Sequence, residues 1–164
     1  MIRFIVLITA VYLVNFWPDS GKALNAAASG VSNAKAAYTL STFEIPEQLK
    51  LEVSGLAPLP DGRLAIAIRK GEIWIADQTS HPESTLYTPF AKGLHEPLGL
   101  AFHKDALYTV QRTELTRIRD LDHDGIADEY WTIAKGWGVT GNYHEYAYGP
   151  QFDLEGHAWI TLNI

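Results

Sequence analysis

Cysteine is absent from the 164-residue sequence. This absence excludes a disulfide-stabilised scaffold, a thiolate metal site, a cysteine nucleophile, haem attached through cysteine and a lipoprotein anchor. Positive charge is also scarce, because 13 Lys and Arg face 19 Asp and Glu and give a formal net charge of −6. Nucleic-acid binding depends mainly on basic side chains that neutralise phosphates, so we expect no nucleic-acid partner. An acidic chain is better suited to divalent cations.

A long hydrophobic run occurs only near the N-terminus. Residues 4–17 are almost entirely apolar, which is too short for an ordinary membrane span of about 20 residues. The run follows the basic Arg3 and precedes small residues at 26–28, the order expected of a secretory signal. We therefore predict a signal peptide over residues 1–28 and a flexible lead-in over 29–46. The alternative is a retained anchor with membrane association, and either places the protein in the periplasm or outside the cell.

The rest of the chain repeats itself. Gly-Leu-Ala occurs at 55–57 and again at 99–101, and a third copy begins near Tyr146. Each copy has short apolar or alternating runs separated by polar turn residues, which is the pattern of β-hairpins. Beyond residue 50 no segment shows convincing helical periodicity. The expected second strands are 64–68, 107–110 and 158–162, the third strands 72–76 and 115–119, and the fourth strands 85–90 and 129–134.

A four-stranded unit that repeats every 40–50 residues is typical of a β-propeller blade. We predict an all-β fold, a partial β-propeller of about two and a half blades over residues 47–164. The blades span 47–92, 93–138 and the incomplete 139–164. A β-sandwich with chance internal similarity is the alternative. Propellers usually have at least four blades, so we expect a piece of a longer protein, or else an open edge that pairs with another chain.

The strongest local motif is the acidic stretch from Asp120 to Asp128, which reads D-x-D-x-D-G-x-x-D. Calcium takes six to eight oxygen ligands, and carboxylates at alternate loop positions converge on one centre. Position 12 is Trp131 instead of the usual bidentate Glu, and Glu129 is the nearby carboxylate that could replace it. An acidic turn without metal is the alternative, although its carboxylates would repel one another. The predicted calcium ligands are Asp120, Asp122, Asp124, the carbonyl of Ile126, and Asp128.

Two His-Glu pairs are the candidate active-site elements. His95-Glu96 precedes the first strand of the second blade, and His144-Glu145 precedes the first strand of the third. The innermost strands of a propeller line its axis, so equivalent positions in successive blades should face a common pocket. An imidazole titrates near neutrality and can act as a general base. Purely structural roles for both histidines are the alternative.

These motifs resemble the glucose/sorbosone dehydrogenase family. The resemblance rests on Pro60-Asp61-Gly62-Arg63-Leu64, on Leu98 to His103 and on Gly141-Asn142-Tyr143-His144-Glu145, and it covers residues 47–164. Members of that family are six-bladed propellers that use pyrroloquinoline quinone (PQQ). The subgroup that the chain most resembles is the large membrane-bound dehydrogenases of planctomycete-type bacteria.

The resemblance implies a PQQ-dependent oxidation of a sugar or alcohol. It implies that His144 is the catalytic base, and that His95, Glu96 and Arg112 contact the cofactor. The remaining cofactor ligands would lie in later blades, so the chain by itself is expected to be inactive. One alternative is a non-catalytic, calcium-stabilised module that binds glycans or proteins. Another is a lactonase-type hydrolase with an axial calcium, which the loop position of the Asp cluster disfavours.

Overall fold

The computed structural model describes residues 41–142 and 144–163. The predicted signal peptide and residues 29–40 of the lead-in lie outside the described residues. Within the described residues the fold is all-β, apart from a 3₁₀ turn at Pro82–Ser84. The fold class predicted from the sequence is therefore confirmed.

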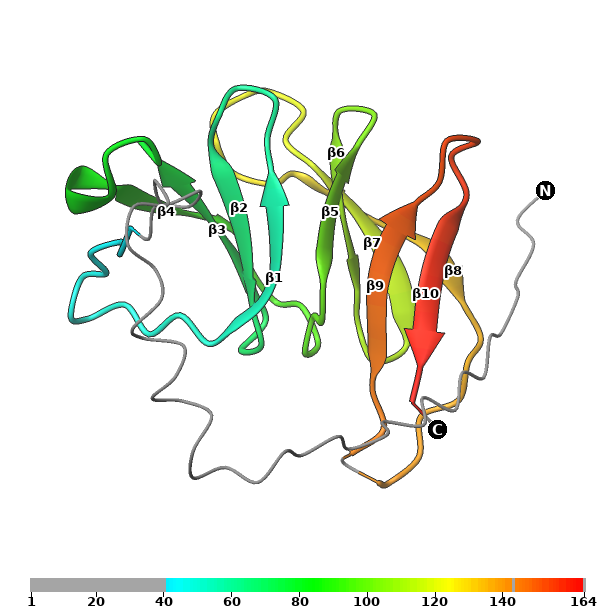
Figure 1. Cartoon of the computed structure of the whole chain (residues 1–164). Coiled ribbons are helices and arrows are strands. Elements are labelled where there is room, and N and C mark those ends of the chain that lie inside the picture. Colours follow the sequence, from blue (N-terminus) through cyan, green and yellow to red (C-terminus); the bar gives the residue numbers. More distant parts are fainter. Residues whose placement is uncertain (1–40, 143, 164) are drawn as a thin grey trace, which may run out of the picture. The chain divides into compact units, whose positions relative to one another are not determined.

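The strands form three antiparallel sheets, each with its strands in chain order, which we call blades 1, 2 and 3 (Figure 1). Blade 1 consists of β1 (Val53–Pro58), β2 (Leu64–Ile68), β3 (Glu72–Asp77) and β4 (Leu86–Ala91). Blade 2 consists of β5 (Leu100–His103), β6 (Ala106–Val110), β7 (Glu114–Arg119) and β8 (Glu129–Lys135). Blade 3 has two strands, β9 (Ala147–Phe152) and β10 (Ala158–Leu162). Two four-stranded blades and a two-stranded third make up the partial propeller.

Tight turns at sequence-defined positions set the hairpins. Lys104 and Asp105, between β5 and β6, both have positive φ, as a two-residue hairpin turn of this twist requires. Between β1 and β2, the Asp61 carboxylate accepts a hydrogen bond from the backbone N–H of Arg63 at 3.0 Å. Gly62 takes the left-handed conformation in this turn, with φ +90°. These local interactions explain why the strands could be predicted from turn residues.

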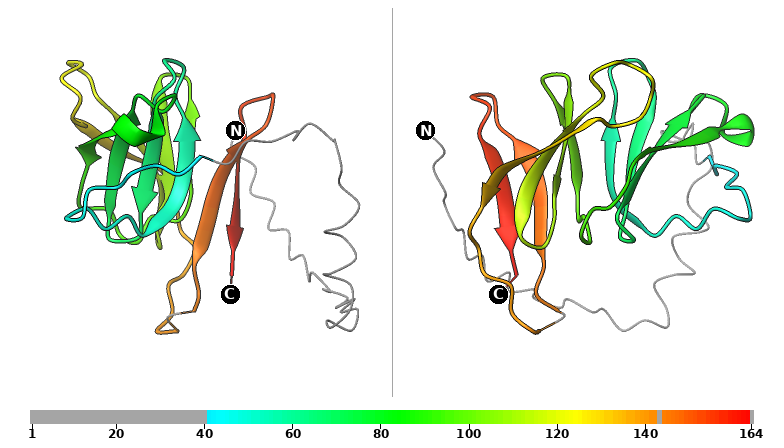
Figure 2. Two further views of the ribbon diagram at one scale, coloured as in Figure 1. Left: turned by 60° about the vertical axis from the view of Figure 1, so that its left-hand side comes forward. Right: turned by 180° about the vertical axis from the view of Figure 1, so that it is seen from behind.

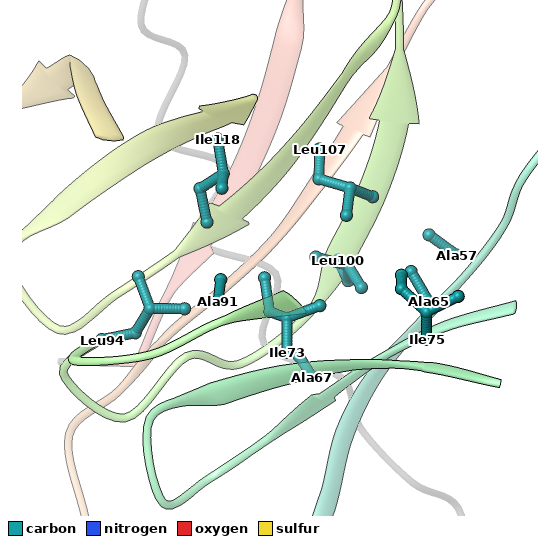
Figure 3. Packing of buried hydrophobic residues seen from close by; sticks show 10 residues of the cluster. All are labelled: Ala57, Ala65, Ala67, Ile73, Ile75, Ala91, Leu94, Leu100, Leu107 and Ile118. Carbon is teal, nitrogen blue, oxygen red and sulfur yellow. The ribbon is translucent and has the colours of Figure 1, made fainter. Parts of the chain in front are cut away.

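The blades pack face to face through apolar side chains. Small residues of blade 1, including Ala57, Ala65 and Ala67, leave room for larger side chains of blade 2. Figure 3 shows this cluster, in which Ile73 and Ile75 of blade 1 lie near Leu100, Leu107 and Ile118 of blade 2, with Ala91 and Leu94 completing it. Because these residues come from two sheets, burying them stabilises the contact between blades as well as each blade.

A second cluster joins blade 2 to blade 3. Val110 and Leu115 of blade 2 pack with Ala147 of blade 3. At the edge of the cluster the ring of His103 stacks on Phe152, with centroids 4.2 Å apart.

The first strands of the three blades, β1, β5 and β9, follow one another in space (Figure 2). The Gly99 N–H donates to the carbonyl of Ser54 at 2.9 Å, and the Gly149 N–H donates to that of Leu98 at 3.0 Å. Both donors are glycines, and both acceptors lie one residue before a glycine. The same backbone contact therefore recurs at each junction between blades.

Candidate functional site

The residues singled out from the sequence lie on two loops that lead into first strands. Residues 92–99 precede β5 and carry His95-Glu96; residues 136–146 precede β9 and carry His144-Glu145. We call these segments the mouth loops. Both histidines are exposed, while Glu96 and Glu145 are half-buried.

Arg112, just after β6, connects the two mouth loops. Its guanidinium forms an ion pair with Glu96 at 3.0 Å, and the Arg112 side chain is only 11% exposed. On the other side it donates to the carbonyl of Glu145 at 3.1 Å and to that of Asn142 at 3.4 Å. It also lies 4.9 Å from the centre of the Tyr146 ring, within cation–π range. One arginine thus joins the loops that carry the two His-Glu pairs.

Further hydrogen bonds order the second mouth loop. The indole N–H of Trp137 donates to the carbonyl of Arg112 at 2.8 Å. The side chain of Asn142 accepts a hydrogen bond from the backbone N–H of His144 at 3.2 Å. The carbonyl of His144 accepts a hydrogen bond from the Asn163 side chain at 2.9 Å. The backbone of His144 is therefore fixed from both sides.

His95 is held by its backbone. Its N–H donates to the side-chain oxygen of Gln111, and its carbonyl accepts from the N–H of Arg112 at 3.3 Å. The four residues predicted for catalysis or cofactor binding, His95, Glu96, Arg112 and His144, thus belong to one connected set of contacts. The predicted role of each in binding a cofactor or moving a proton stays a prediction.

The Arg–Glu pairing has a counterpart in blade 1. Arg69 and Glu52 are the repeat equivalents of Arg112 and Glu96, and they approach to 3.9 Å. Arg69 also lies 3.9 Å from Glu96 in the next blade, just as Arg112 reaches the loop before blade 3. The repeat shows that this arginine position links neighbouring blades, which sequence spacing alone did not reveal.

The acidic loop connects β7 to β8. Ligand oxygens of Asp120, Asp122 and Asp124 lie within 4.8 Å of one another, a spacing that one cation could bridge. Desolvation by itself would raise the pKa of Asp120, but hydrogen bonds from the backbone N–H groups of Gly125 and His123 lower that pKa below its ordinary value. Asp120 is therefore held in its charged form.

The carboxylates of Asp128 and Glu129, near this loop, lie outside the converging group. Asp128 accepts a hydrogen bond from the Leu121 N–H at 2.7 Å and so closes the loop at its base. Glu129 accepts hydrogen bonds from Arg119 at 2.8 Å and from Arg117 at 3.0 Å. The hydrogen bond from Arg119, supported by Arg117, lowers the pKa of Glu129 to about 2. The Glu129 carboxylate therefore pairs with arginines of β7 and does not point toward the acidic loop.

The acidic loop also contacts blade 1. The Ala127 N–H donates to the carbonyl of Phe90 in β4 at 2.8 Å. Beside it, the hydroxyl of Tyr130 in β8 accepts from the N–H of Lys92, directly after β4, at 3.2 Å. Order in this loop therefore supports the junction between blades 1 and 2.

A second group with metal-ligand side chains, which the sequence analysis did not single out, lies in the β9–β10 turn. Asp153, Glu155 and His157 bring ligand atoms within 4.8 Å of one another. Asp153, however, accepts hydrogen bonds from the Trp159 indole at 2.8 Å and from His157, and the Trp159 bond is the main reason why its pKa falls to about 2. These hydrogen bonds stabilise the β9–β10 turn, and they explain why the three side chains lie close together.

Over residues 41–142 and 144–163, no helix has the length and apolar character needed to cross a membrane.

The repeated four-stranded blades, with their linked mouth loops, are the architecture of a partial β-propeller. The chain belongs to a family described as a domain of unknown function (DUF7133), whose pattern matches residues 42–163. Among solved structures it is similar to a candidate oxidoreductase (glucose dehydrogenase) from Thermus thermophilus, with 25% identity and a TM-score of 0.44. The match covers 56% of this chain and 31% of that protein. No curated protein matches the chain.

Proposed function

We propose that the chain forms one side of the active site of a PQQ-type sugar or alcohol dehydrogenase. The observation that carries this proposal is the Arg112 link, which brings the His95-Glu96 and His144-Glu145 loops to one mouth. An exposed imidazole on an ordered backbone is suited to take a proton from a substrate hydroxyl. His144 is the proposed base, and His95, Glu96 and Arg112 are the proposed cofactor or substrate contacts.

The described residues fit PQQ as one wall of a pocket only. PQQ would supply the electron-accepting carbonyl, while its carboxylates need basic partners. Arg112 already donates to Glu96 and to the Asn142 and Glu145 carbonyls, so its positive charge is shared with these acceptors. The more exposed Arg69, 3.9 Å from Glu96, is a second basic side chain near this mouth. We therefore expect the chain by itself to be inactive.

We further propose that calcium binds the loop from Asp120 to Asp128 and has a structural role. The converging carboxylates of Asp120, Asp122 and Asp124 support this, and the Ile126 carbonyl and Asp128, directly or through water, are the proposed further ligands. A calcium-binding propeller behind a signal peptide would function in the periplasm or outside the cell.

The redox proposal is tested by titrating PQQ into this chain and into any longer protein that contains it, followed by absorbance. A longer protein with more blades should bind PQQ and oxidise a sugar or alcohol with an artificial dye only after PQQ is added. His144→Ala should abolish turnover but retain PQQ binding, because the base is not needed to hold the cofactor. His81→Ala, an exposed histidine beside the 3₁₀ turn of blade 1, is the matched control. Absence of PQQ binding by the longer protein would contradict the proposal.

The calcium proposal is tested by terbium luminescence. Terbium bound at the acidic loop should be sensitised by the exposed Trp131, and calcium should displace it. Combined Asp122→Ala and Asp124→Ala should remove the signal, because two of the three converging carboxylates are lost. Glu155→Ala, in the other carboxylate-containing turn, is the matched control and should leave it unchanged. A signal that depends on Glu155 and survives the double substitution would place the ion elsewhere.

A second candidate function is a non-catalytic, calcium-stabilised module for glycan or protein binding. The observation that favours this function is the Arg69–Glu52 pair of blade 1, which has no neighbouring histidine. An Arg–Glu pair at this position therefore has a structural role without catalysis. In that case His144→Ala would leave ligand binding intact, and the longer protein would show no redox activity.

A further inference from the structure

Gln111 directly follows β6, precedes Arg112 and is only 8% exposed. The oxygen of its side-chain amide accepts a hydrogen bond from the N–H of His95 in the first mouth loop. The amide nitrogen donates to the Thr116 hydroxyl at 2.7 Å and to the Glu114 carboxylate at 3.2 Å. Because a carboxylate only accepts and a backbone N–H only donates, these partners leave the amide one orientation. Gln111 therefore joins the interior of blade 2 to the first mouth loop.

The partners of the Gln111 amide belong to a polar network on β7 and β8. The Thr116 hydroxyl donates to Glu114 at 2.6 Å, and the Thr132 hydroxyl donates to the other oxygen of the same carboxylate at 2.9 Å. Thr116 is 2% exposed and lies two residues before Ile118, so both side chains are on the face of blade 2 that packs against blade 1. Since its partners are fixed in two strands, the amide holds the mouth loop from a rigid base.

Blade 1 has a carboxylate in the same place but no amide. Glu72 begins β3 and accepts a hydrogen bond from the Trp74 indole at 2.8 Å. Glu114 begins β7 and accepts one from Thr116, again two residues further along its strand. The residue directly before the arginine of blade 1 is Ile68, which is 2% exposed. An apolar side chain thus fills this position in blade 1, so packing by itself does not require an amide at the end of the second strand.

The segment that Gln111 holds has a strained backbone. Glu96 has φ +46°, a conformation that residues other than glycine seldom adopt and that persists only where the surroundings hold it. The Gln111 amide binds the N–H of His95, and the Arg112 N–H donates to the carbonyl of His95 at 3.3 Å. The Arg112 guanidinium pairs with Glu96 at 3.0 Å. Two consecutive residues, Gln111 and Arg112, therefore hold the His95-Glu96 pair through three contacts.

We propose that Gln111 is a positioning residue of the candidate active site, whose amide fixes the backbone of His95-Glu96 beside Arg112. The proposal rests on the proposed function, in which His95 and Glu96 contact the cofactor or substrate. Gln111 acts through these two residues and does not itself contact the reacting groups. This role explains an amide in blade 2 where blade 1 has isoleucine, because a buried amide costs free energy unless its polar atoms have partners.

The first test measures amide hydrogen exchange in the full chain by nuclear magnetic resonance, without PQQ. Gln111→Met keeps the length of the side chain and removes its acceptor and its donors. Exchange at His95 and Glu96 should accelerate by about 5- to 150-fold, the range for loss of a buried hydrogen bond, and more than exchange in β6 and β7. Ile68→Met, the same change at the equivalent position of blade 1, is the matched control and should leave exchange at His95 and Glu96 unchanged.

A second variant tests the base of the network. Thr116→Val keeps the volume of the side chain but removes one of the two acceptors of the amide nitrogen, so it should accelerate exchange at His95 by a smaller factor. This variant decides the question if Gln111→Met has an altered circular dichroism spectrum. Unchanged exchange at His95, or equal acceleration in β6, β7 and the mouth loop, would overturn the proposal, because a general loss of stability affects all of them together.

The second test uses a longer protein with more blades. Gln111→Met should weaken PQQ binding or raise the KM for the substrate by about fivefold or more, while kcat, which depends on the proposed base His144, changes by less. Ile68→Met should change neither constant. Absence of PQQ binding by the wild-type longer protein would contradict the proposed function, and the exchange measurement would still decide whether Gln111 orders the His95 loop. Wild-type PQQ affinity and KM in Gln111→Met would overturn the positioning role alone.

Discussion

Replacing Gly99 with alanine is expected to lower the free energy of unfolding by about 4 kcal/mol. Gly99 has φ +106°, where side chains other than glycine are strained, and a Cβ there would lie 2.3 Å from the Gly149 carbonyl oxygen. Since the obstructing atom belongs to the backbone of β9, no rotamer change can relieve the contact. Denaturant unfolding measures the loss.

Two matched variants separate the two causes. Gly62→Ala has the strained φ but nothing within 4 Å of the added carbon, so it should cost about 1–2 kcal/mol. Gly55→Ala lacks a positive φ, but its Cβ would lie 2.6 Å from the Gly99 carbonyl carbon, so it reports the inter-blade clash alone. Equal losses for Gly99→Ala and Gly62→Ala would show that the contact of the added methyl group with β9 adds nothing to the cost of the strained φ.

Removing the Arg112 side chain should destabilise the protein by about 2–4 kcal/mol and loosen the second mouth loop. The substitution leaves Glu96 without its close cation and leaves the carbonyls of Asn142 and Glu145 without their donor. We expect Arg112→Ala to accelerate amide hydrogen exchange over residues 139–146, with denaturant unfolding as the measure of stability. Arg112→Lys should restore part of the Glu96 pairing but not the carbonyl contacts, because lysine lacks the planar fork of donors.

Arg69→Ala is the control for the Arg112 prediction. Arg69 is 53% exposed and both of its ion pairs measure 3.9 Å, so its loss should cost less than about 1 kcal/mol. If Arg112→Ala leaves the exchange of residues 139–146 unchanged, the link between the mouth loops does not order the His144 loop.

Contacts between blades distinguish a propeller from a row of separate hairpins, and both Gly99 and Arg112 take part in them. Within each blade the stabilising contacts are local, between strands a few residues apart. Between blades they join residues far apart in the chain, such as Ser54 to Gly99 and Leu98 to Gly149. Substitutions at these junctions should therefore reduce the order of the mouth loops even where the strands remain intact.

The sequence by itself determined the strands and the turns, because these depend on interactions within a few residues. The two-residue turn at Lys104-Asp105 and the alternation in β2 and β6 predicted where the hairpins lie, and the repeat of Gly-Leu-Ala predicted that they recur as blades. The acidic spacing likewise predicted that Asp120, Asp122 and Asp124 converge, since the carboxylates of one short loop have few other ways to point.

Only the tertiary structure decided which partners the side chains contact. The contact of Arg112 with the loop before β9, 30 residues away, could not be predicted from sequence spacing. Glu129 was a candidate to complete the acidic loop until strand pairing set it opposite Arg119. The demand for glycine at position 99 depends on the approach of β9. In each case the deciding partner is remote in sequence or lies on another strand, and its position follows from pairing and packing of the sheets.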